Sequence, residues 1–350
     1  MNVGASARRL AALALAAALL AGAGGCGRRF LEPKQSPKAP YIPPPETFIL
    51  VAGWTQPAWQ PTCVLLTHSG ILLVAEDSAR VRNYSSLGQR GQITPIDIYR
   101  FNGLTKPVQV AEGNSHVFVA DMGDGSKQHP ISVMEYDPSQ GLDTPMDPVH
   151  VVVDTTWVRI KGVASDLQRN LYVSCDARMY IFQPPNLPAL DTETVVYRYR
   201  APNYDTALRD TVAQQGNGVG SLQDAHQIVW SAGVLYVADT GKDAAQALDP
   251  NRMNFGFFKV DGTEPGGPGA CKRPQGVAAD GVNDFYVVDT GNRRVLRYNL
   301  DGTFDQVVNQ FGPDGMLAPT SATAGLVQSS LYLYVADPAA QRINVYRFQQ

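Results

Sequence analysis

A short run of apolar and small residues that ends in an acid recurs along this chain. In each copy an aromatic or aliphatic residue, Val and a small residue precede Asp or Glu, a pattern typical of a short buried strand. The copies occupy residues 73–76, 118–121, 235–239, 286–289 and 334–337. A sixth copy, at 171–175, has Cys175 in place of the acid and Asp176 directly after it.

The spacing of these strands predicts a repeated unit. The copies end at residues 76, 121, 175, 239, 289 and 337, so successive ends are 45, 54, 64, 50 and 48 residues apart. A unit of four short strands needs that length, and self-similarity at this period is typical of propellers and solenoids. In the most regular unit, 273–311, alternation places strands at 274–278, 284–289, 294–298 and 304–311. The sequence therefore predicts an all-β, six-bladed β-propeller of four-stranded antiparallel blades.

Both ends of the chain are needed to close this ring of blades. The sixth unit ends at Phe348 after its third strand, and residues 47–53 resemble 304–312, which include the outer strand of the fifth unit. We therefore expect the last blade to be closed by the N-terminal strand, which removes the exposed edges of an open sheet. The propeller domain is then predicted to span residues 47–350.

The fifth unit also carries the features of a known repeat, which the fourth and sixth units share in part. The residues concerned are 276–278, 286–289 and 290–295, with similar stretches at 237–241, 336–337 and 341–346. Together they resemble the NHL repeat, while the first three units are more diverged. NHL repeats build six-bladed propellers, so the resemblance implies the same fold.

The acid that ends each second strand is interpreted as part of the scaffold. An Asp at a strand end accepts hydrogen bonds from the amides of the tight turn that follows it. Residues 290–292 after Asp289 form such a turn, in which Gly291 can take a positive φ. We expect Arg294 and Arg342 to pack across neighbouring blades and to pair with these acids.

The first 25 residues have the features of a targeting segment. Two arginines precede an apolar stretch at 10–23, which is shorter than the roughly 20 residues that span a bilayer. Residues 23–26 resemble a bacterial lipobox, although Ala replaces the usual Leu three residues before Cys26. The resemblance implies a signal peptide at 1–25 and a lipid on Cys26. An ordinary secretory signal is the alternative.

Residues 26–46 are interpreted as a lipidated Cys followed by a membrane tether. The stretch is rich in Pro and poor in large apolar groups, so we expect it to stay extended as polyproline II. Bacterial lipoproteins carry more than one acyl chain, which is enough for stable anchoring. We therefore expect a bacterial cell-envelope protein, lipid-anchored to a membrane and facing the periplasm or the exterior, with a monomeric domain. The sequence does not distinguish which membrane or leaflet.

Charge and cysteine content argue against several classes of function. The net charge is −3 and the pI is about 6.0, so no basic field attracts a nucleic acid. Cys63, Cys175 and Cys271 lie in different units at different positions, which argues against a disulfide framework or a zinc knuckle. We expect most of them to be small buried residues, and the sequence leaves open whether any two pair.

Function in a propeller is expected at the ends of the central channel. Alignment of the six inner strands brings two sets of polar and mixed residues to equivalent positions. The first ring is Thr62, Val108, Lys161, His226, Gln275 and Thr320. The second ring, one residue further along, is Cys63, Gln109, Gly162, Gln227, Gly276 and Ser321. The predicted ligand-binding face consists of Thr62, Lys161, His226, Gln227, Gln275 and Thr320.

Histidine is sparse around these rings. A zinc enzyme needs three protein ligands at one ion, whereas only one of the five His of the chain, His226, falls on a ring. No cofactor is therefore expected, with Ca²⁺, Mg²⁺ or Zn²⁺ as alternatives. His226 is the candidate general base, and hydrogen bonding within the channel is its alternative role.

Three segments are longer than the repeat requires, at 121–126, 204–221 and 240–254. Asp121 and Asp124 of the first segment form a candidate calcium site that lacks the distal Glu of a full calcium loop. Loops on a rigid scaffold commonly carry recognition. With His226, the three segments predict one asymmetric patch over blades two to four.

The sequence therefore favours an envelope lipoprotein whose propeller face binds a protein, peptide or glycan without catalysis. The alternative is a metal-assisted lyase or hydrolase at the channel mouth, with His226 as base and with Lys161 and Gln227 orienting an anionic or carbonyl group. A purely structural part of an envelope assembly is a third class. The residues lean away from an enzyme and do not identify the ligand.

Overall fold

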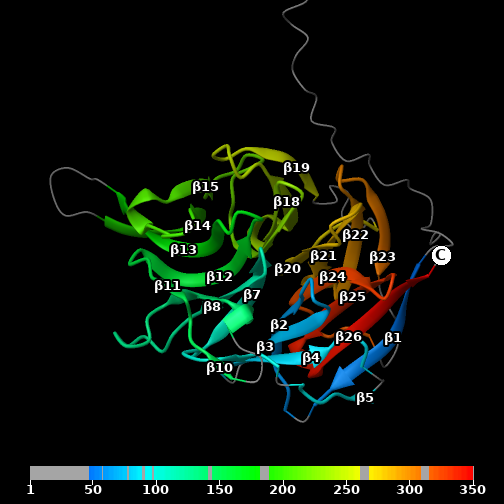
Figure 1. Cartoon of the computed structure of the whole chain (residues 1–350). Coiled ribbons are helices and arrows are strands. Elements are labelled where there is room, and N and C mark those ends of the chain that lie inside the picture. Colours follow the sequence, from blue (N-terminus) through cyan, green and yellow to red (C-terminus); the bar gives the residue numbers. More distant parts are fainter. Residues whose placement is uncertain are drawn as a thin grey trace, which may run out of the picture. The chain divides into compact units, whose positions relative to one another are not determined.

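The computed structural model describes residues 47–349 apart from 57, 77–78, 89–90, 97, 141–143, 182–188, 261–267 and 309–314. The described part is all-β, and its strands are grouped into six blades (Figure 1). The predicted six-bladed β-propeller is confirmed. The predictions for Cys26 and for the Pro-rich segment lie outside the described residues. Within the described residues, no helix has the length and apolar character needed to cross a membrane.

The first three blades follow one another along the chain, each from its inner strand outwards. Blade one contains β2 (Pro61–Leu66), β3 (Ile71–Glu76) and β4 (Arg80–Ser85). Blade two contains β7 (Pro107–Gly113), β8 (His116–Asp121), β9 (Ser132–Tyr136) and β11 (His150–Val152). Blade three contains β12 (Trp157–Ser165), β13 (Leu171–Ile181), β14 (Ala189–Tyr199) and β15 (Asp210–Gln214). A separate short pair is formed by β6 (Arg100–Phe101) and β10 (Pro145–Met146).

The other three blades follow the same order. Blade four contains β16 (Ala225–Ser231), β17 (Val234–Asp239), β18 (Ala244–Leu248) and β19 (Gly256–Val260). Blade five contains β20 (Gly276–Ala279), β21 (Asp284–Asp289), β22 (Arg294–Asn299) and β23 (Phe304–Val308). Blade six contains β24 (Ser321–Val327), β25 (Ser330–Asp337), β26 (Arg342–Gln349) and β1 (Thr47–Thr55), with β5 (Gly91–Gln92) beside β1. Single 3-10 turns are η1 (Pro138–Gln140), η2 (Thr206–Leu208), η3 (Thr240–Lys242), η4 (Thr290–Asn292) and η5 (Pro338–Ala340).

The N-terminal strand closes the ring, as predicted. β1 pairs antiparallel with β26 from Thr47 opposite Gln349 to Thr55 opposite Arg342, with one irregularity between Leu50 and Ala52. Figure 1 shows β1 in blue beside β26 in red. The aromatic ring of Phe48 in β1 lies 5.8 Å from that of Tyr286 in blade five, so closure also seals the contact with the preceding blade.

Blade one has a different outer edge. Its sheet contains three strands within the described residues, and the side chain of Asn83 in β4 takes over the hydrogen bonding of a fourth. Asn83 Nδ2 donates to the carbonyl of Tyr99 at 2.8 Å, and Asn83 Oδ1 accepts from the amide of Tyr99. An amide side chain offers the same donor and acceptor as a peptide group, so it continues the ladder onto the segment that precedes β6.

The acids that end the second strands are buried, and they have the predicted scaffold role with different donors. Asp337 accepts from the amides of Leu317 and Ala318 at 2.7 and 3.0 Å, and from its own turn only through Ala340 at 3.2 Å. Asp239 similarly accepts from Gln223. Each acid therefore fixes mainly the segment that leads into the inner strand of its own blade, rather than the turn that follows it.

The two predicted arginines differ in their contacts. Arg294 pairs with Asp289, with Nε 2.8 Å from Oδ2, as expected from the fifth unit. Arg342 donates from its guanidinium to the carbonyl of Gly315 at 2.5 Å. Both side chains therefore hold the loop that precedes an inner strand, Arg294 through the carboxylate and through the carbonyl of Ala270.

A threonine directly after the acid links blade to blade. Thr240 Oγ1 donates to the carbonyl of Pro274 at 2.5 Å, and Thr290 Oγ1 donates to the carbonyl of Pro319 at 2.7 Å. Each proline stands just before the inner strand of the next blade. The Asp-Thr pair thus fixes its own blade with the carboxylate and the next blade with the hydroxyl.

Apolar clusters between adjacent blades supply most of the remaining contacts. The rings of Tyr236 in blade four and Phe285 in blade five stack at 4.9 Å, and both side chains are buried. Burial of a large apolar side chain contributes about 1.5–3 kcal/mol. Cys63, Cys175 and Cys271 are buried and form no disulfide among the described residues, as expected for small apolar residues. Burial also raises the pKa of the Cys63 thiol.

Candidate functional site

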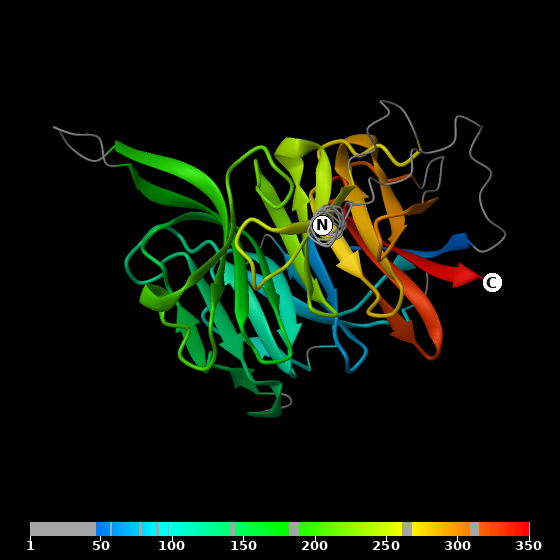
Figure 2. The ribbon, with the colours of Figure 1, turned by 90° about the horizontal axis from the view of Figure 1, so that it is seen from above.

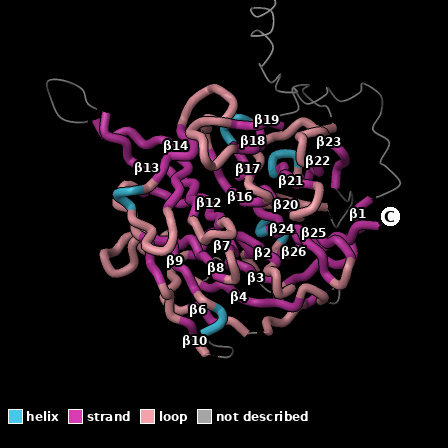
Figure 3. Tube along the Cα trace, turned by 45° about the horizontal axis from the view of Figure 1, so that its top comes forward, coloured by secondary structure: helices cyan, strands magenta, loops and turns pink. Residues whose placement is uncertain are grey.

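The first ring of residues lies around one cavity at the channel mouth. The inner strands β2, β7, β12, β16, β20 and β24 contact one another in a closed circle at the centre of the propeller (Figure 3). A cavity of about 430 Å³ opens between their first residues. It is lined by all six first-ring residues, by Cys63, Gln109, Gln227 and Ser321 of the second ring, and by Lys106, Met122, Arg159 and Ile160. The structure therefore brings the predicted binding face together, and its binding of a ligand stays a prediction.

Two glutamines form the floor of this cavity. Gln109 of blade two accepts from the amide of Val163 at 2.8 Å and donates to the carbonyl of Ile228 at 3.2 Å, which joins three blades. Gln227 donates to the carbonyl of Ala322 at 3.4 Å across the channel. Both glutamines also line a smaller cavity of about 70 Å³ beyond them. The mouth is therefore a cup with a polar floor.

The second-ring glycines make room for these glutamines. A Cβ on Gly162 would lie 2.7 Å from Gln109 Oε1, and a Cβ on Gly276 would lie 2.8 Å from Gln227 Oε1. Side chains at either position would displace the floor. The mixed composition of the second ring thus follows from packing: two large amides fit because two neighbours have no side chain.

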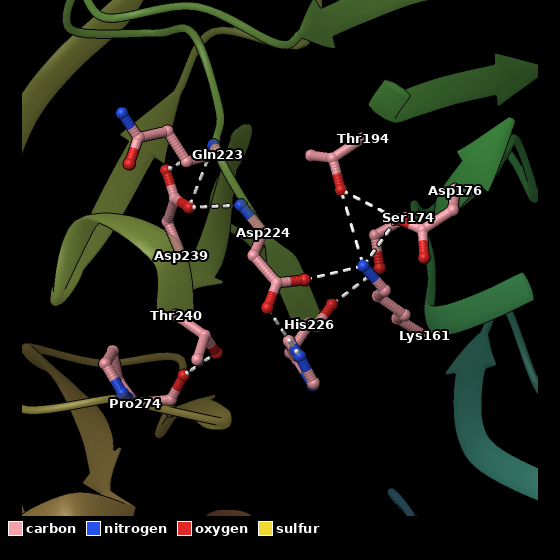
Figure 4. A network of polar contacts seen from close by, with 10 residues as sticks. All are labelled: Lys161, Ser174, Asp176, Thr194, Gln223, Asp224, His226, Asp239, Thr240 and Pro274. Atoms are coloured by element: carbon pink, nitrogen blue, oxygen red, sulfur yellow. Dashed lines mark hydrogen bonds and ion pairs between the residues drawn. The ribbon is translucent and has the colours of Figure 1, made fainter. Parts of the chain in front are cut away.

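A charged network spans blades three and four at the mouth (Figure 4). Lys161 Nζ lies 2.5 Å from Asp176 Oδ1 and 2.6 Å from Asp224 Oδ1, and its side chain is only 5% exposed. Thr194 donates to Asp176 at 3.0 Å. Lys161 was expected to orient an anionic group. Its charge is instead engaged by two carboxylates of the protein, so it does not act as a free cation.

His226 lies at the edge of this network, with its side chain 22% exposed. Its Nε2 is 3.4 Å from Asp224 Oδ2, two residues earlier in the chain. The contact with His226 lowers the pKa of the Asp224 carboxyl well below its usual range. Partial burial opposes this effect, and Lys161 adds to it. Asp224 therefore stays ionised and can orient the imidazole.

The network occupies the position where blade three departs from the repeat. In β13 the buried Cys175 stands where other blades have their acid, and Asp176 stands where blades four and five have Thr240 and Thr290. Successive strand residues point to opposite faces, so this one-residue displacement of the acid turns its carboxylate toward Lys161. The hydroxyl link between blades is thereby replaced by a chain of ion pairs.

In blade three a different acid, Asp154, provides the buried carboxylate that accepts hydrogen bonds from the scaffold. Asp154, in the loop before β12, is buried and accepts from the amide of Thr156 and the hydroxyl of Tyr199, both at 2.9 Å. Arg209 Nη1 lies 3.2 Å from Asp154 Oδ2, the same oxygen that accepts from Tyr199. Because Asp154 supplies the missing carboxylate, Asp176 is released for the channel mouth.

The strands of this blade are also longer than the repeat requires. β13 and β14 pair over their whole length, from Leu171 opposite Tyr199 to Ile181 opposite Ala189. The pairing of β13 with β12 ends at Ala177, so the hairpin continues past its own blade. Figure 2 shows it in green, extending beyond the other blades. Asp176 and Thr194 lie at the base of this hairpin, which the repeat pattern did not reveal.

Two cations of the mouth were missed in the sequence. Lys106 and Arg159 line the cavity, are exposed, and have no side-chain ion pair or hydrogen bond among the described residues. Each stands two residues before a first-ring residue, Val108 or Lys161, and Asp224 has the same place before His226. Residues two apart in a strand share a face. A third ring, read two positions upstream, could therefore have been found: Gln60, Lys106, Arg159, Asp224, Arg273 and Ala318.

The expected patch of three long loops is only partly present. Residues 240–254 contain the tight turn η3 and the third strand β18, so this insertion does not exist. Residues 204–221 contain η2 and the outer strand β15. The correction for 240–254 has a physical cause: β18 is rich in alanine, and its five buried residues lack the polar alternation by which a strand is recognised. The segment after β8 remains a loop.

The two candidate calcium ligands of that loop, Asp121 and Asp124, have different surroundings and accept from different donors. Asp121 is buried and accepts from the amides of Thr105, Lys106 and Gly123 at 2.7–3.1 Å. Asp124 is exposed and accepts from the amide of Ser126. Among the described residues, no three His, Cys, Asp or Glu side chains are grouped so that they could hold a metal ion.

Two other histidines gather on a carboxylate far from the mouth. His116, at the start of β8, has Nδ1 3.0 Å from Glu135 Oε1, and His150 has Nδ1 2.8 Å from Glu135 Oε2. Arg169 of blade three reaches His116 Nε2 at 2.9 Å. This cluster links blades two and three at the end of β8 opposite to the cavity.

The chain is similar to known proteins in fold rather than in sequence. No protein-family model matches it, and no curated protein matches it. A solved protein of unknown function from Bacteroides thetaiotaomicron VPI-5482 is 14% identical over 87% of this chain and 76% of its own, with a TM-score of 0.57. A streptogramin B lyase structure is 10% identical over 86% and 98%, with a TM-score of 0.54. A nidogen/laminin complex is 15% identical over 75% and 80%, with a TM-score of 0.47.

At these identities the similarity establishes the fold alone. The chain is a six-bladed β-propeller protein in which the N-terminal strand completes the last blade. Membership of the NHL-repeat family, suggested by residues of blades four, five and six, stays a prediction from the sequence.

Proposed function

We propose that the channel mouth binds a protein, peptide or glycan without catalysis. The observation that supports this function best is the cup itself, a cavity of about 430 Å³ lined by residues of all six blades and floored by Gln109 and Gln227. Binding sites are concave and largely pre-formed, with a few placed polar groups. Here the Lys161 network and the floor are held by internal hydrogen bonds, so the shape exists before a ligand arrives.

Blocking the cup tests this function. Gln275 lines the cavity, and its side chain has no hydrogen bond among the described residues, so Gln275→Trp should fill the mouth without breaking a contact. Peptide and glycan arrays probed with the full chain should show ligands that this variant no longer binds. Val282→Trp is the matched control, because Val282 is an exposed residue in the turn between β20 and β21 of the same blade. If the Gln275→Trp variant still binds the same ligands, the binding site lies outside the cup.

A lyase or hydrolase is the second candidate, and one observation favours it. Asp224 contacts Nε2 of His226 at 3.4 Å, which is the relationship of an orienting carboxylate to a general base. The fold is shared with a streptogramin B lyase structure, although that similarity shows the fold alone. Any activity of the full chain that His226→Ala abolishes, and that Gln275→Trp also blocks, would support this candidate over pure binding.

We further propose that this propeller is an NHL-type domain held at a bacterial membrane. Residues 1–25 act as a lipoprotein signal peptide, Cys26 takes the lipid, and the Pro-rich residues to 46 act as a tether. The propeller then faces the periplasm or the exterior. In that setting the mouth meets ligands of the cell envelope, and a purely structural place in an envelope assembly is the remaining alternative.

A further inference from the structure

Two cations that line the cavity at the mouth, Lys106 and Arg159, form its basic side. Lys161 also lines the cavity, but it is held by Asp176 and Asp224, neither of which lines it. A ligand entering the cavity therefore meets the two positive charges of the basic side.

Lys161 does not neutralise an incoming anion. Its ammonium is in contact with two carboxylates and is almost completely buried. A third anion at Lys161 would have to displace Asp176 or Asp224, and either displacement would leave a partly buried charge without its partner. An anionic group is therefore directed to Lys106 and Arg159.

Arg159 is available for such a group. It stands opposite Asp176 in the pairing of β12 with β13, where an ion pair would be expected. Asp176 is instead held by Lys161 and Thr194, and no ion pair of Arg159 occurs within the described residues. A guanidinium offers two parallel donors that match a carboxylate. The same network that engages Lys161 thus leaves Arg159 free.

Lys106 completes the basic side from the neighbouring blade. Its backbone amide is fixed by Asp121 at 3.0 Å, while its ammonium lines the cavity. Met122 and Val108 lie along the same wall and provide apolar contact beside the two cations. No aromatic side chain of the described residues lines this cavity. Sugar rings usually stack on aromatic rings, so the wall fits a peptide better than a glycan.

We infer that Lys106 and Arg159 bind a carboxylate of an acidic peptide at the mouth. This inference rests on the proposed binding function and names the chemistry of its ligand. The carboxylate contacts the two cations, and the aliphatic part of the same side chain lies against Met122 and Val108.

The test uses the full chain and two short peptides with blocked ends, triglutamate and triglutamine. Calorimetry should show that triglutamate binds more tightly and that the difference fades when salt is raised, because exposed charges are screened. The double variant Lys106→Gln/Arg159→Gln should weaken triglutamate binding about tenfold, as expected for two exposed ion pairs. It should leave triglutamine unchanged. Arg200→Gln is the control for loss of a surface cation, since Arg200 is 65% exposed and does not line the cavity.

The outcomes separate this inference from the proposed function. If Gln275→Trp abolishes peptide binding and the double variant binds triglutamate as well as the unchanged protein does, the carboxylate inference is wrong and the binding function stands. If triglutamate binding persists in Gln275→Trp as well, both are wrong for this peptide. If the protein instead binds a uronic-acid oligosaccharide more tightly than triglutamate, and the double variant loses this preference, the two cations do bind a carboxylate. The ligand is then a glycan, and the inference of an acidic peptide is wrong. Absence of binding by either peptide at millimolar concentration would overturn the inference.

Discussion

Lys161 Nζ of blade three lies 2.6 Å from Asp224 Oδ1 of blade four. The next two junctions, between blades four and five and between blades five and six, are instead joined by a threonine hydroxyl that donates to a proline carbonyl. An ion pair at a blade junction is more sensitive to its partners than a neutral hydrogen bond, because each charge depends on the other for solvation. It also places charge where a ligand enters. The junction of blades three and four therefore combines scaffold and site.

Removal of the lysine should expose this dependence. Lys161→Met leaves Asp176 and Asp224 facing each other without a cation, so we expect a loss of about 1–3 kcal/mol in the free energy of unfolding, less than for a fully buried pair because both acids are partly exposed. Urea unfolding of the full chain measures the change. The double variant Lys161→Met/Asp176→Asn should recover part of the loss. Equal stability of Lys161→Met and the unchanged protein would contradict the role of the ion pairs.

Asp224 makes this junction dependent on pH. Its folded pKa lies below the unfolded value of about 3.9, because of His226 and Lys161. A depressed pKa contributes stability that is complete above the unfolded value and is lost as pH falls toward the folded one. Asp224→Asn should therefore be less stable than the unchanged protein at pH 7, and the difference should shrink below about pH 4. Urea midpoints at pH 7, 5 and 3 test this, and a constant difference would contradict it.

The threonine links can be tested in the same way. Thr290→Val keeps the shape of the side chain and removes the donor to the carbonyl of Pro319, which should cost about 1 kcal/mol. Thr303→Val is the control, because among the described residues Thr303 forms hydrogen bonds only through its backbone, in the turn before β23. If both variants unfold at the same urea concentration, the hydroxyl of Thr290 does not join the blades.

Phe48 should contribute strongly to ring closure. It is 6% exposed and packs against Tyr286 and Phe348, so Phe48→Ala should cost about 3 kcal/mol through the cavity it leaves. Phe257→Ala, at an outer-strand residue that is 37% exposed, should cost clearly less. Thermal unfolding of the two variants distinguishes them. Similar losses would mean that Phe48 seals the ring no more than a peripheral aromatic does.

Membrane attachment depends on a single thiol in the lipoprotein proposal. Cys26→Ser removes the sulfur that would carry the lipid, so the protein should move from the membrane fraction to the soluble fraction of cells. Immunoblots of separated fractions measure the distribution. A variant that stays with the membrane would show that the lipobox resemblance is misleading.

Much of the fold follows from the recurring strand that ends in an acid. Its period predicts the six blades, and the likeness of residues 47–53 to the outer strand of blade five predicts the closure by β1. The period does not give every strand end: the inner strand of blade five begins at Gly276 rather than Pro274, whereas those of blades one and two begin at a proline. The alanine-rich β18 lacks alternation, so the sequence predicts a loop there instead of a strand.

The site is harder to predict from the sequence than the fold is, because its geometry depends on residues that are close in space but distant in sequence. Alignment of inner strands identifies the residues around the cavity, including His226. It cannot show that Lys161 is held by Asp176, whose carboxylate reaches the mouth only because Cys175 takes the preceding position. Likewise, the availability of Arg159 follows from the engagement of Asp176 by other residues, which no pattern along one strand reveals.

The pairing of β1 with β26 also governs how the molecule is made. β1 is synthesised first and its partner β26 last, so the ring stays open until the whole domain has left the ribosome. The blades can form early from local hairpins, whereas closure waits for a contact between the most distant parts of the domain and is expected to be slow. Until then the edges of β1 and β26 are unprotected and can pair with other chains. Loss of the final strand by truncation would therefore leave the first one without its partner and reopen the ring.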